Sequence, residues 1–272
     1  MLLIRTDATM NPIALLGIAY DEKSSFLRGP AEAPAAIRRA LASDSANSWS
    51  EDGRDTSLML EDCGDLRGFS KDPISEIETF VAKSVDEFAQ VLVLGGDHSI
   101  SFPSVSAVAK KHGPLTIVHF DAHPDLYDEF EGDRFSHACP FARIMEGDHA
   151  KRLIQIGIRT ANVHQREQAA KFNVETYEAR NWKSQLPAVE GPVYISVDLD
   201  VLDPAFAPGV SHHEPGGLST RELLNAIQSI NAPIVATDVV ELNPTRDLND
   251  VTAMVAAKVV KELAAAMSRN RI

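Results

Sequence analysis

The chain has 272 residues, 44% of them hydrophobic, which is enough for one large α/β domain with a sizeable core, and no linker or repeat divides it. Its formal net charge is −13 and its basic residues are scattered, which argues against a nucleic-acid or anionic-membrane partner. We therefore expect a single domain over residues 1–272 that has neither partner.

Short apolar runs alternate with longer amphipathic segments, which predicts repeated βα units around a parallel sheet. The predicted strands are, in chain order, Ile13 to Ile18, Val91 to Leu94, Leu115 to Phe120, Leu153 to Ile156, Val193 to Val197 and Ile234 to Val240. The predicted helices are Pro30 to Ala42, Ile74 to Ala89, Phe102 to His112, a helix from a capping box at Ser219 through Ile230, and Val251 to Met267. The polar stretch from Ser43 to Thr56 is predicted to be a loop.

Four of the predicted strands run into short polar segments that are rich in acids and histidines. Because the ends of strands in an α/β fold converge on one crevice, these segments can meet although they are far apart in sequence. The segments are Gly95-Gly96-Asp97-His98-Ser99, Asp121-Ala122-His123-Pro124-Asp125, Asp198-Leu199-Asp200-Val201-Leu202-Asp203-Pro204 and Glu241-Leu242-Asn243-Pro244.

The acids and histidines of the first three segments have the spacing of metal ligands. Alternate residues of an extended segment point to one side, and buried acids at a strand end are unstable unless cations compensate them. Two imidazoles and four carboxylates are too oxygen-rich for structural zinc and suit ions such as Mn²⁺. The predicted ligands of a metal pair, which generates a nucleophile from water at neutral pH, are His98, Asp121, His123, Asp125, Asp198 and Asp200.

Two further residues are candidates for catalysis. His137 lies in the loop after the second segment, and the ordinary pKa of an imidazole suits a proton carrier. Asp125 is the alternative proton carrier, and the sequence does not separate the two. Glu241 ends a strand at the same crevice, where a carboxylate can bind a planar cation through two hydrogen bonds.

In this order, the four segments resemble those of the ureohydrolase family, which comprises arginases, agmatinases and their relatives. The match covers Gly95 to Pro244 and is most similar to plant-type arginases and microbial agmatinases. The resemblance implies a three-layer α/β domain around a mostly parallel eight-stranded sheet, and a homo-oligomer, either a trimer or a hexamer. It also implies that two Mn²⁺ ions are held by the predicted ligands, that His137 is the catalytic histidine, and that Glu241 receives the guanidinium of a small substrate.

The substrate is expected to be a linear guanidino compound that loses urea. Animal-type arginases bind the α-carboxylate and α-amino groups through a Ser/Asn-rich segment before the catalytic histidine, whereas this chain has Gly132 to Ser136, in which Arg134 could replace part of that clamp. Glu214 is a further candidate for binding substrate. Because the site and the chain are acidic, a dication is favoured over a zwitterion. We expect agmatine, hydrolysed to putrescine, with L-arginine as the alternative and another guanidino acid after it.

Two other classes of protein are less favoured. A metallophosphatase also uses paired metals, but its Asn-His-Glu segment and basic phosphate-binding residues are not evident in the sequence. A non-enzymatic binding protein is disfavoured because every metal-ligand position is filled.

The cysteine content and the N-terminal residues suggest a location. Cys63 and Cys139 match no zinc or disulfide framework, which favours a reducing compartment. The stretch from Met1 to Asp7 lacks the long apolar run of a signal peptide. We therefore expect a cytoplasmic protein.

Overall fold

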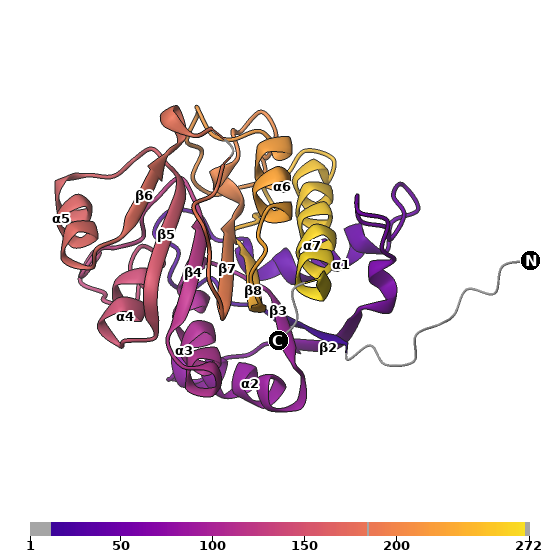
Figure 1. Cartoon of the computed structure of the whole chain (residues 1–272), viewed down its shortest axis with the longest axis horizontal. Coiled ribbons are helices and arrows are strands. Elements are labelled where there is room, and N and C mark those ends of the chain that lie inside the picture. Colours follow the sequence, from indigo (N-terminus) through magenta and orange to yellow (C-terminus); the bar gives the residue numbers. More distant parts are fainter. Residues whose placement is uncertain (1–11, 184, 270–272) are drawn as a thin grey trace, which may run out of the picture.

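The computed structural model describes residues 12–183 and 185–269. Eight strands form one sheet in the order β2-β1-β3-β8-β7-β4-β5-β6, and every neighbouring pair is parallel (Figure 1). This confirms the predicted fold class, with a sheet that is parallel throughout. The strands are β1 (Ile13–Ile18), β2 (Leu60–Leu66), β3 (Gln90–Leu94), β4 (Leu115–Phe120), β5 (Ala150–Ile158), β6 (Glu175–Glu178), β7 (Val193–Asp198) and β8 (Ile234–Val240).

Helices cover both faces of the sheet and complete three layers. Helices α1, α6 and α7 pack in one hydrophobic cluster, and α2, α3 and α4 pack in the other. Along β1, Ile13 and Leu15 face the first cluster while Ala14 and Leu16 face the second, so the strand is apolar throughout. The helices are α1 (Ala33–Leu41), α2 (Pro73–Glu87), α3 (Ser101–His112), α4 (Pro140–Glu146), α5 (Val163–Lys171), α6 (Thr220–Gln228) and α7 (Val251–Arg269).

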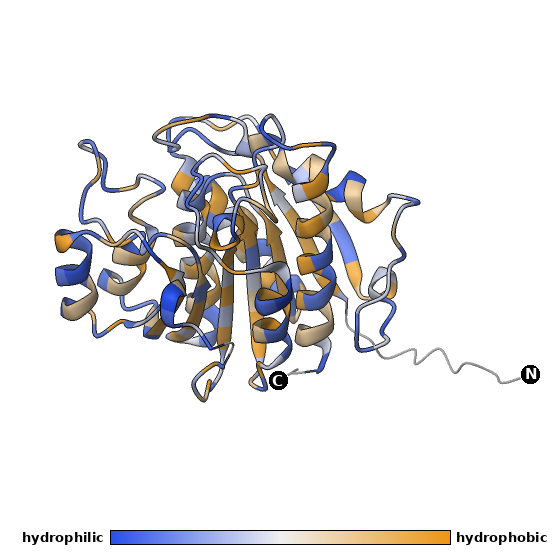
Figure 2. Ribbon diagram, turned by 90° about the horizontal axis from the view of Figure 1, so that it is seen from above, coloured by the Kyte–Doolittle hydropathy of each residue, from blue (hydrophilic) through white to orange (hydrophobic). Residues whose placement is uncertain are grey.

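The apolar runs mark the centre of the sheet and leave out its edges. Figure 2 shows central strands that are largely hydrophobic and outer loops that are largely hydrophilic. The two strands that the periodicity did not predict, β2 and β6, are the edge strands, with the polar sequences LEDCGDL and ETYE. The side chains of these edge strands are largely exposed or half-buried, and charge on an edge strand opposes pairing with other chains.

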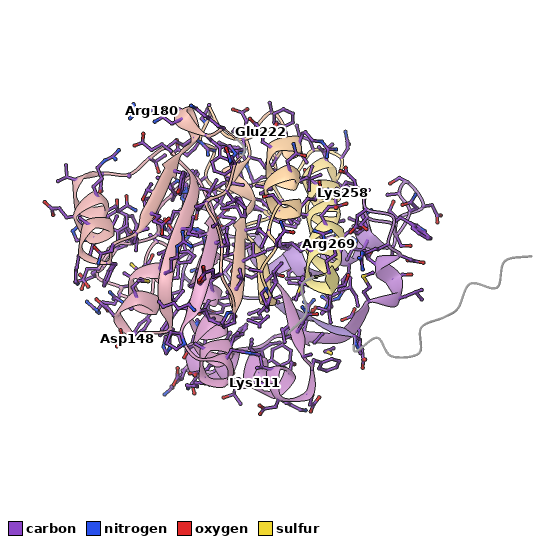
Figure 3. All side chains as sticks on the ribbon, in the orientation of Figure 1. Lys111, Asp148, Arg180, Glu222, Lys258 and Arg269 are labelled. Atoms are coloured by element: carbon purple, nitrogen blue, oxygen red, sulfur yellow. The ribbon has the colours of Figure 1, made fainter. Side chains whose placement is uncertain are left out.

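The loop predicted over Ser43 to Thr56 is held against α7 by ion pairs. Figure 3 labels Lys258 and Arg269 on that helix. Lys258 Nζ lies 3.6 Å from Glu51 Oε1, and an Arg269 guanidinium nitrogen lies 2.6 Å from Asp52 Oδ2. These contacts hold the loop against α7.

Other sequence-based expectations concern the N-terminus and the cysteines. The stretch from Met1 to Asp7, on which the absence of a signal peptide was judged, lies outside the described residues. Both cysteines are free thiols, with Cys63 exposed and Cys139 buried. Within residues 12–183 and 185–269, no helix has the length and hydrophobicity needed to cross a membrane.

The order of the strands explains how four distant polar segments come together. Strands β3, β8, β7 and β4 are consecutive neighbours in the middle of the sheet. Each of them ends in one of the four segments, and because all four strands are parallel, the segments lie along one edge.

Candidate metal centre and active site

The first imidazole of the site is that of His98, which follows β3 in a short 3-10 helix, His98–Ile100. In the turn before it, the backbone at Gly96 packs closely against that of Tyr20, since a Cβ on Gly96 would overlap the carbonyl oxygen of Tyr20. This explains the second glycine of the segment, and a Cβ on the first, Gly95, would overlap the side chain of Val240. Asp97 caps the helix by accepting a hydrogen bond from the backbone N–H of Ser99, so its carboxylate is used for local structure.

His98 is fully buried, and its Nδ1 atom faces three carboxylates. The Oδ2 atoms of Asp121, Asp125 and Asp198 lie 3.1, 3.0 and 3.2 Å from it, respectively. Asp125 has a φ of 48°, a left-handed conformation that costs a non-glycine residue about 1–3 kcal/mol and that clusters at functional sites.

The second imidazole, that of His123, faces two carboxylates. Its Nδ1 lies 3.3 Å from Asp121 Oδ1 and 3.0 Å from Asp200 Oδ2. Asp121 therefore presents one oxygen to each imidazole and lies between them.

Backbone N–H groups hold the carboxylates in these orientations. Asp121 Oδ1 accepts from the N–H of His123 at 2.6 Å, Asp198 Oδ1 from that of Asp200 at 2.8 Å, and Asp200 Oδ1 from that of Ala122 at 3.1 Å. Fixed in this way, the three side chains direct further oxygen lone pairs at the same small region.

The residues of this cluster fit divalent cations. Among the described residues, His98 Nδ1 is buried without a hydrogen-bond partner, although three carboxylate oxygens surround it. Burial opposes the charged form of His98, yet the three carboxylates raise its pKa well above the usual value. Burial and the charges of Asp200 and Asp121 raise the pKa of Asp198 in the same region. The four carboxylates of the cluster carry more negative charge than its two imidazoles can neutralise, and this excess suits metal ions.

Two groups of side chains could each hold one ion. His98, Asp125 and Asp198 lie around the first position, and His123 and Asp200 lie around the second. Asp121 faces both. The structure thus brings all six predicted ligands together.

Beside the cluster, Glu241 and His137 contact each other. Glu241 follows β8 with a φ of 63°, and its Oε1 accepts from the backbone N–H of His98 at 2.9 Å and lies 3.0 Å from His137 Nδ1. Its Oε2 is buried and has no partner among the described residues. A buried carboxylate oxygen without a donor is costly, so this atom is an acceptor ready for a cationic donor.

His137 is held on its other side by the loop after β1. Its Nε2 lies 2.8 Å from Ser25 Oγ and, when the imidazole is neutral, accepts from the backbone N–H of Ser25 at 3.2 Å. Burial lowers the pKa of His137, but the hydrogen bond and charge of Glu241 outweigh this effect and raise the pKa to about 9. The imidazole can therefore hold a proton next to the cluster.

A cavity of about 240 Å³ opens over these groups. The predicted site residues that line it are His123, Asp125, His137, Asp198, Asp200 and Glu241. Sequence reasoning missed the others, which are Ser25, Tyr127, Phe130, Ala138, Thr160, Gln165 and His212. None of them belongs to the four polar segments, so no motif singled them out. The described lining contains no lysine or arginine.

The structure does not bring Arg134 and Glu214 into the cavity lining. The Arg134 guanidinium lies 2.6 Å from Asp128 and 2.9 Å from Glu146, and about half of its side chain is exposed. Glu214 Oε1 lies 3.8 Å from His123 Nε2, behind the imidazole. The partners of Arg134 therefore lie outside the cavity lining, whereas Glu214 approaches the cavity only through His123.

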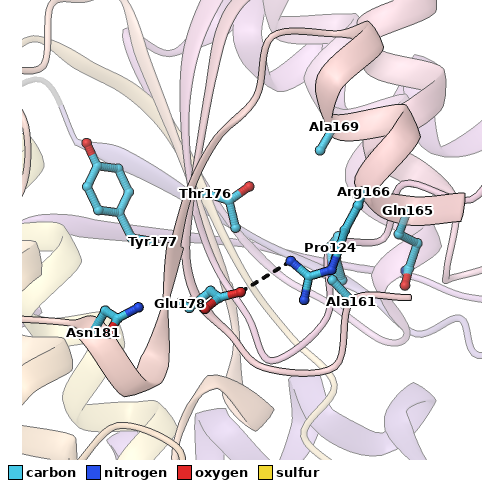
Figure 4. Close-up of a pocket in the computed structure, with 9 residues that line it drawn as sticks. All are labelled: Pro124, Ala161, Gln165, Arg166, Ala169, Thr176, Tyr177, Glu178 and Asn181. Atoms are coloured by element: carbon cyan, nitrogen blue, oxygen red, sulfur yellow. Dashed lines mark hydrogen bonds and ion pairs between the residues drawn. The ribbon is translucent and has the colours of Figure 1, made fainter. Parts of the chain in front are cut away.

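A second cavity of about 430 Å³ lies beside α5 and β6 (Figure 4). Pro124 and Gln165 form part of its wall, and Arg166 and Glu178 form an ion pair of 3.2 Å across it. Its charges are therefore already paired, and it contains none of the predicted site residues.

Comparisons with known proteins agree with this architecture. The family model described as "Arginase family" matches residues 11–266. "Arginase 1, mitochondrial" of Arabidopsis thaliana is 50% identical, over 94% of this chain and 81% of the relative. "Agmatinase" of Bacillus anthracis is 34% identical, over 92% of this chain and 90% of the relative. The solved structure "Arginase from Medicago truncatula" superposes with a TM-score of 0.89 at 46% identity, covering 95% of this chain and 88% of that one.

The prediction of a cytoplasmic location is wrong by these comparisons. The Arabidopsis relative is named mitochondrial, and further plant relatives are named mitochondrial or chloroplastic, so these relatives are organellar rather than cytoplasmic proteins. The prediction relied on the lack of an apolar leader and on unpaired cysteines. Organelle-targeting peptides are Arg-rich and amphipathic without a long apolar run, so neither feature distinguishes an organelle from the cytoplasm.

The match extends over nearly the whole chain and includes all four polar segments. A model match of this length and a relative at 50% identity exceed what a shared fold alone would give. The chain belongs to the arginase family, the ureohydrolases that act on the C–N bonds of small guanidino compounds.

Proposed function

We propose that this protein is an arginase that hydrolyses L-arginine to L-ornithine and urea with two Mn²⁺ ions. The observation that carries the reaction is the buried, unpaired Oε2 of Glu241, in the wall of a cavity shared with a cluster of carboxylates and imidazoles. A guanidinium is planar and cationic, and it presents paired N–H donors that match such an oxygen.

The choice of arginine corrects the expectation that agmatine is preferred. Plant relatives named arginase are 48–50% identical, whereas relatives named agmatinase are 33–34% identical. The expectation relied on the negative charge of the metal ligands and Glu241, which surround the guanidinium end of the substrate. That end is the same in arginine and agmatine, so its charge cannot separate them.

The other end of the substrate meets neutral groups. The cavity lining includes the hydroxyl groups of Ser25 and Thr160 and the amide of Gln165. Hydroxyl and amide groups can both donate and accept, so they can bind a carboxylate and an ammonium without a charged partner. This lining can therefore accommodate a zwitterion.

We assign the ions to the two groups of side chains described above. His98, Asp125 and Asp198 would hold one ion, His123 and Asp200 the other, and Asp121 both. Oxygen-rich sites with single imidazoles suit Mn²⁺. When bound, such a pair lowers the pKa of water to make a nucleophile and stabilises the charge that develops in the transition state.

The side chains around the ions orient the substrate and move protons. Glu241 Oε2 accepts N–H groups of the guanidinium and holds its carbon over the cluster. His137, tied to Glu241 at 3.0 Å and to Ser25 at 2.8 Å, holds a proton that can pass to the departing amine. Asp125, which also lines the cavity, is the alternative proton carrier.

The substrate assignment predicts that kcat/KM for L-arginine exceeds that for agmatine by at least about tenfold, since a site with donors for a carboxylate leaves them unpaired when the group is missing. Urea release by the manganese-loaded enzyme with each substrate measures the ratio. A ratio below one would overturn the arginine assignment. If agmatine were the only one of the two substrates to release urea, the assignment of arginine would fail, but the proposed hydrolysis of a guanidinium group would stand.

His137→Ala is expected to keep both metals and to lose about 10²–10⁴-fold in kcat, because His137 contributes proton transfer and lies outside the ligand cluster. Metal analysis and steady-state kinetics on the same preparation measure both quantities. His164→Ala is a matched control, since that histidine is exposed and outside the cavity lining. Wild-type kcat in His137→Ala would exclude His137 as the proton carrier and favour Asp125.

A further inference from the structure

A third buried imidazole lies directly behind the cluster. His119 is fully buried on β4, two residues before Asp121, and its ring stacks on Phe141 with centroids 3.8 Å apart. Its Nε2 lies 2.8 Å from Asp121 Oδ2, and His98, His119 and Asp121 bring possible ligand atoms within 4.8 Å of one another. His119 is therefore either a further metal ligand or a donor to Asp121.

The neighbouring strand decides between these two roles. Gln155 on β5 is the register partner of His119 on β4. The Gln155 amide nitrogen lies 2.6 Å from the carbonyl oxygen of Pro124 and 3.0 Å from His119 Nδ1. A carbonyl oxygen only accepts hydrogen bonds, so the atom beside it must be the amide nitrogen.

The orientation of the amide fixes the tautomer of His119. One N–H of Gln155 is used by Pro124, and the other points at His119 Nδ1, which must therefore accept. A neutral imidazole with an accepting Nδ1 carries its proton on Nε2. That proton is directed at Asp121 Oδ2, and a protonated Nε2 has no lone pair for a metal.

We propose that His119 is a positioning residue for the metal pair: it orients the shared carboxylate Asp121, and Gln155 sets its tautomer. Asp121 then accepts one fixed donor on each oxygen, His119 Nε2–H on Oδ2 and the backbone N–H of His123 on Oδ1. With both oxygens held, the remaining lone pairs point toward the His98 side and the His123 side of the cluster. Donors of this kind typically contribute 10–100-fold to metal affinity.

If His119 were instead a metal ligand, it would make an unfavourable contact with Gln155. If Nε2 bound a metal, the proton would sit on Nδ1 and face the amide nitrogen of Gln155, placing two donors against each other. Rotating the amide would put its oxygen against the carbonyl oxygen of Pro124. Each arrangement opposes two like groups in a fully buried place.

The test compares Gln155→Met and His119→Phe with a control, Gln90→Met. Gln90 is also a buried strand glutamine, whose amide donates to the carbonyls of Ile234 and Met267 at 2.6 and 2.9 Å. It lies at the amino end of β3, opposite the site. His119→Phe keeps an aromatic ring to stack on Phe141, and Gln155→Met leaves His119 in place.

Manganese affinity by chelator competition, manganese content at saturation and the melting temperature of the metal-free protein are measured for each variant. We expect both test variants to bind manganese about 10–100-fold more weakly than Gln90→Met, with about two ions per chain still bound at saturation. Equal affinity in Gln155→Met and Gln90→Met overturns the positioning role. A loss of one ion at saturation in His119→Phe overturns it as well and makes His119 a ligand.

These measurements rest on the metal pair of the proposed function but use no substrate. If the wild-type chain bound no manganese, the proposed metal centre itself would fail. If the wild type bound two ions and Gln155→Met matched the control, only the role of His119 and Gln155 would fail.

Discussion

Asp121→Asn is expected to abolish measurable urea release and to lower the manganese bound per chain. Asp121 is the only described carboxylate that faces both imidazoles, with Oδ2 at 3.1 Å from His98 Nδ1 and Oδ1 at 3.3 Å from His123 Nδ1. An amide in its place offers one oxygen instead of two and no charge. Metal ions supply several kcal/mol of transition-state stabilisation, which corresponds to a loss of at least about 10³-fold in kcat/KM.

Metal analysis after manganese loading and the rate of urea release test this prediction on one preparation. Asp203→Asn is a suitable control, because that carboxylate accepts backbone N–H groups of Ala205 and Gly216 and does not line the cavity. Full manganese content with wild-type kcat/KM in Asp121→Asn would rule out Asp121 as the shared ligand.

Glu241→Gln is expected to lower kcat/KM by about 10²–10³-fold while both metals stay bound. The amide of glutamine can still accept hydrogen bonds from His98 and His137 through its oxygen. Its NH₂ group then takes the place of the unpaired Oε2 and points donors at the donors of the guanidinium. Losing one partner of a buried, hydrogen-bonded charge pair costs about 2–5 kcal/mol.

Glu178→Gln serves as the control, because Glu178 is not among the residues that line the site cavity and pairs with Arg166 instead. Steady-state kinetics with L-arginine and metal analysis are the measurements. Unchanged kcat/KM in Glu241→Gln would remove Glu241 from substrate binding. A loss of manganese in this variant would instead assign Glu241 to the metal centre.

The sequence predicted the parts of the fold that burial specifies. Strands such as β1 and β8 are covered on both faces, so their residues form continuous apolar runs with recognisable ends. The polar edge strands β2 and β6 leave no such run, because their residues are largely exposed or half-buried. Their pairing depends on the neighbouring strands β1 and β5, and a local pattern cannot report it.

The candidate ligands were predictable for a related reason. They end consecutive strands of a parallel sheet, so knowing the fold class is enough to bring them together. The groups around them were not predictable, because they depend on contacts between side chains. Gln155 and His119 are unremarkable in sequence, and only the register of β4 and β5 places one beside the other.

The substrate end of the cavity was the least predictable part. Arg134 was proposed from its position near His137, but its guanidinium is bound by Asp128 and Glu146. Ser25 reaches the site from the loop after β1, more than one hundred residues from His137 in sequence, through hydrogen bonds to His137. Sequence spacing carries no information on such contacts. The sequence revealed only the negative charge of the site, and that charge suggested a dication as substrate.

The most direct test of the two-metal account is a titration of metal-stripped protein with Mn²⁺ while urea release from L-arginine is followed. The account predicts negligible urea release without metal and a rate that rises until about two equivalents per chain are bound. Full urea release from the metal-stripped protein, or no urea release after two equivalents are bound, would contradict it.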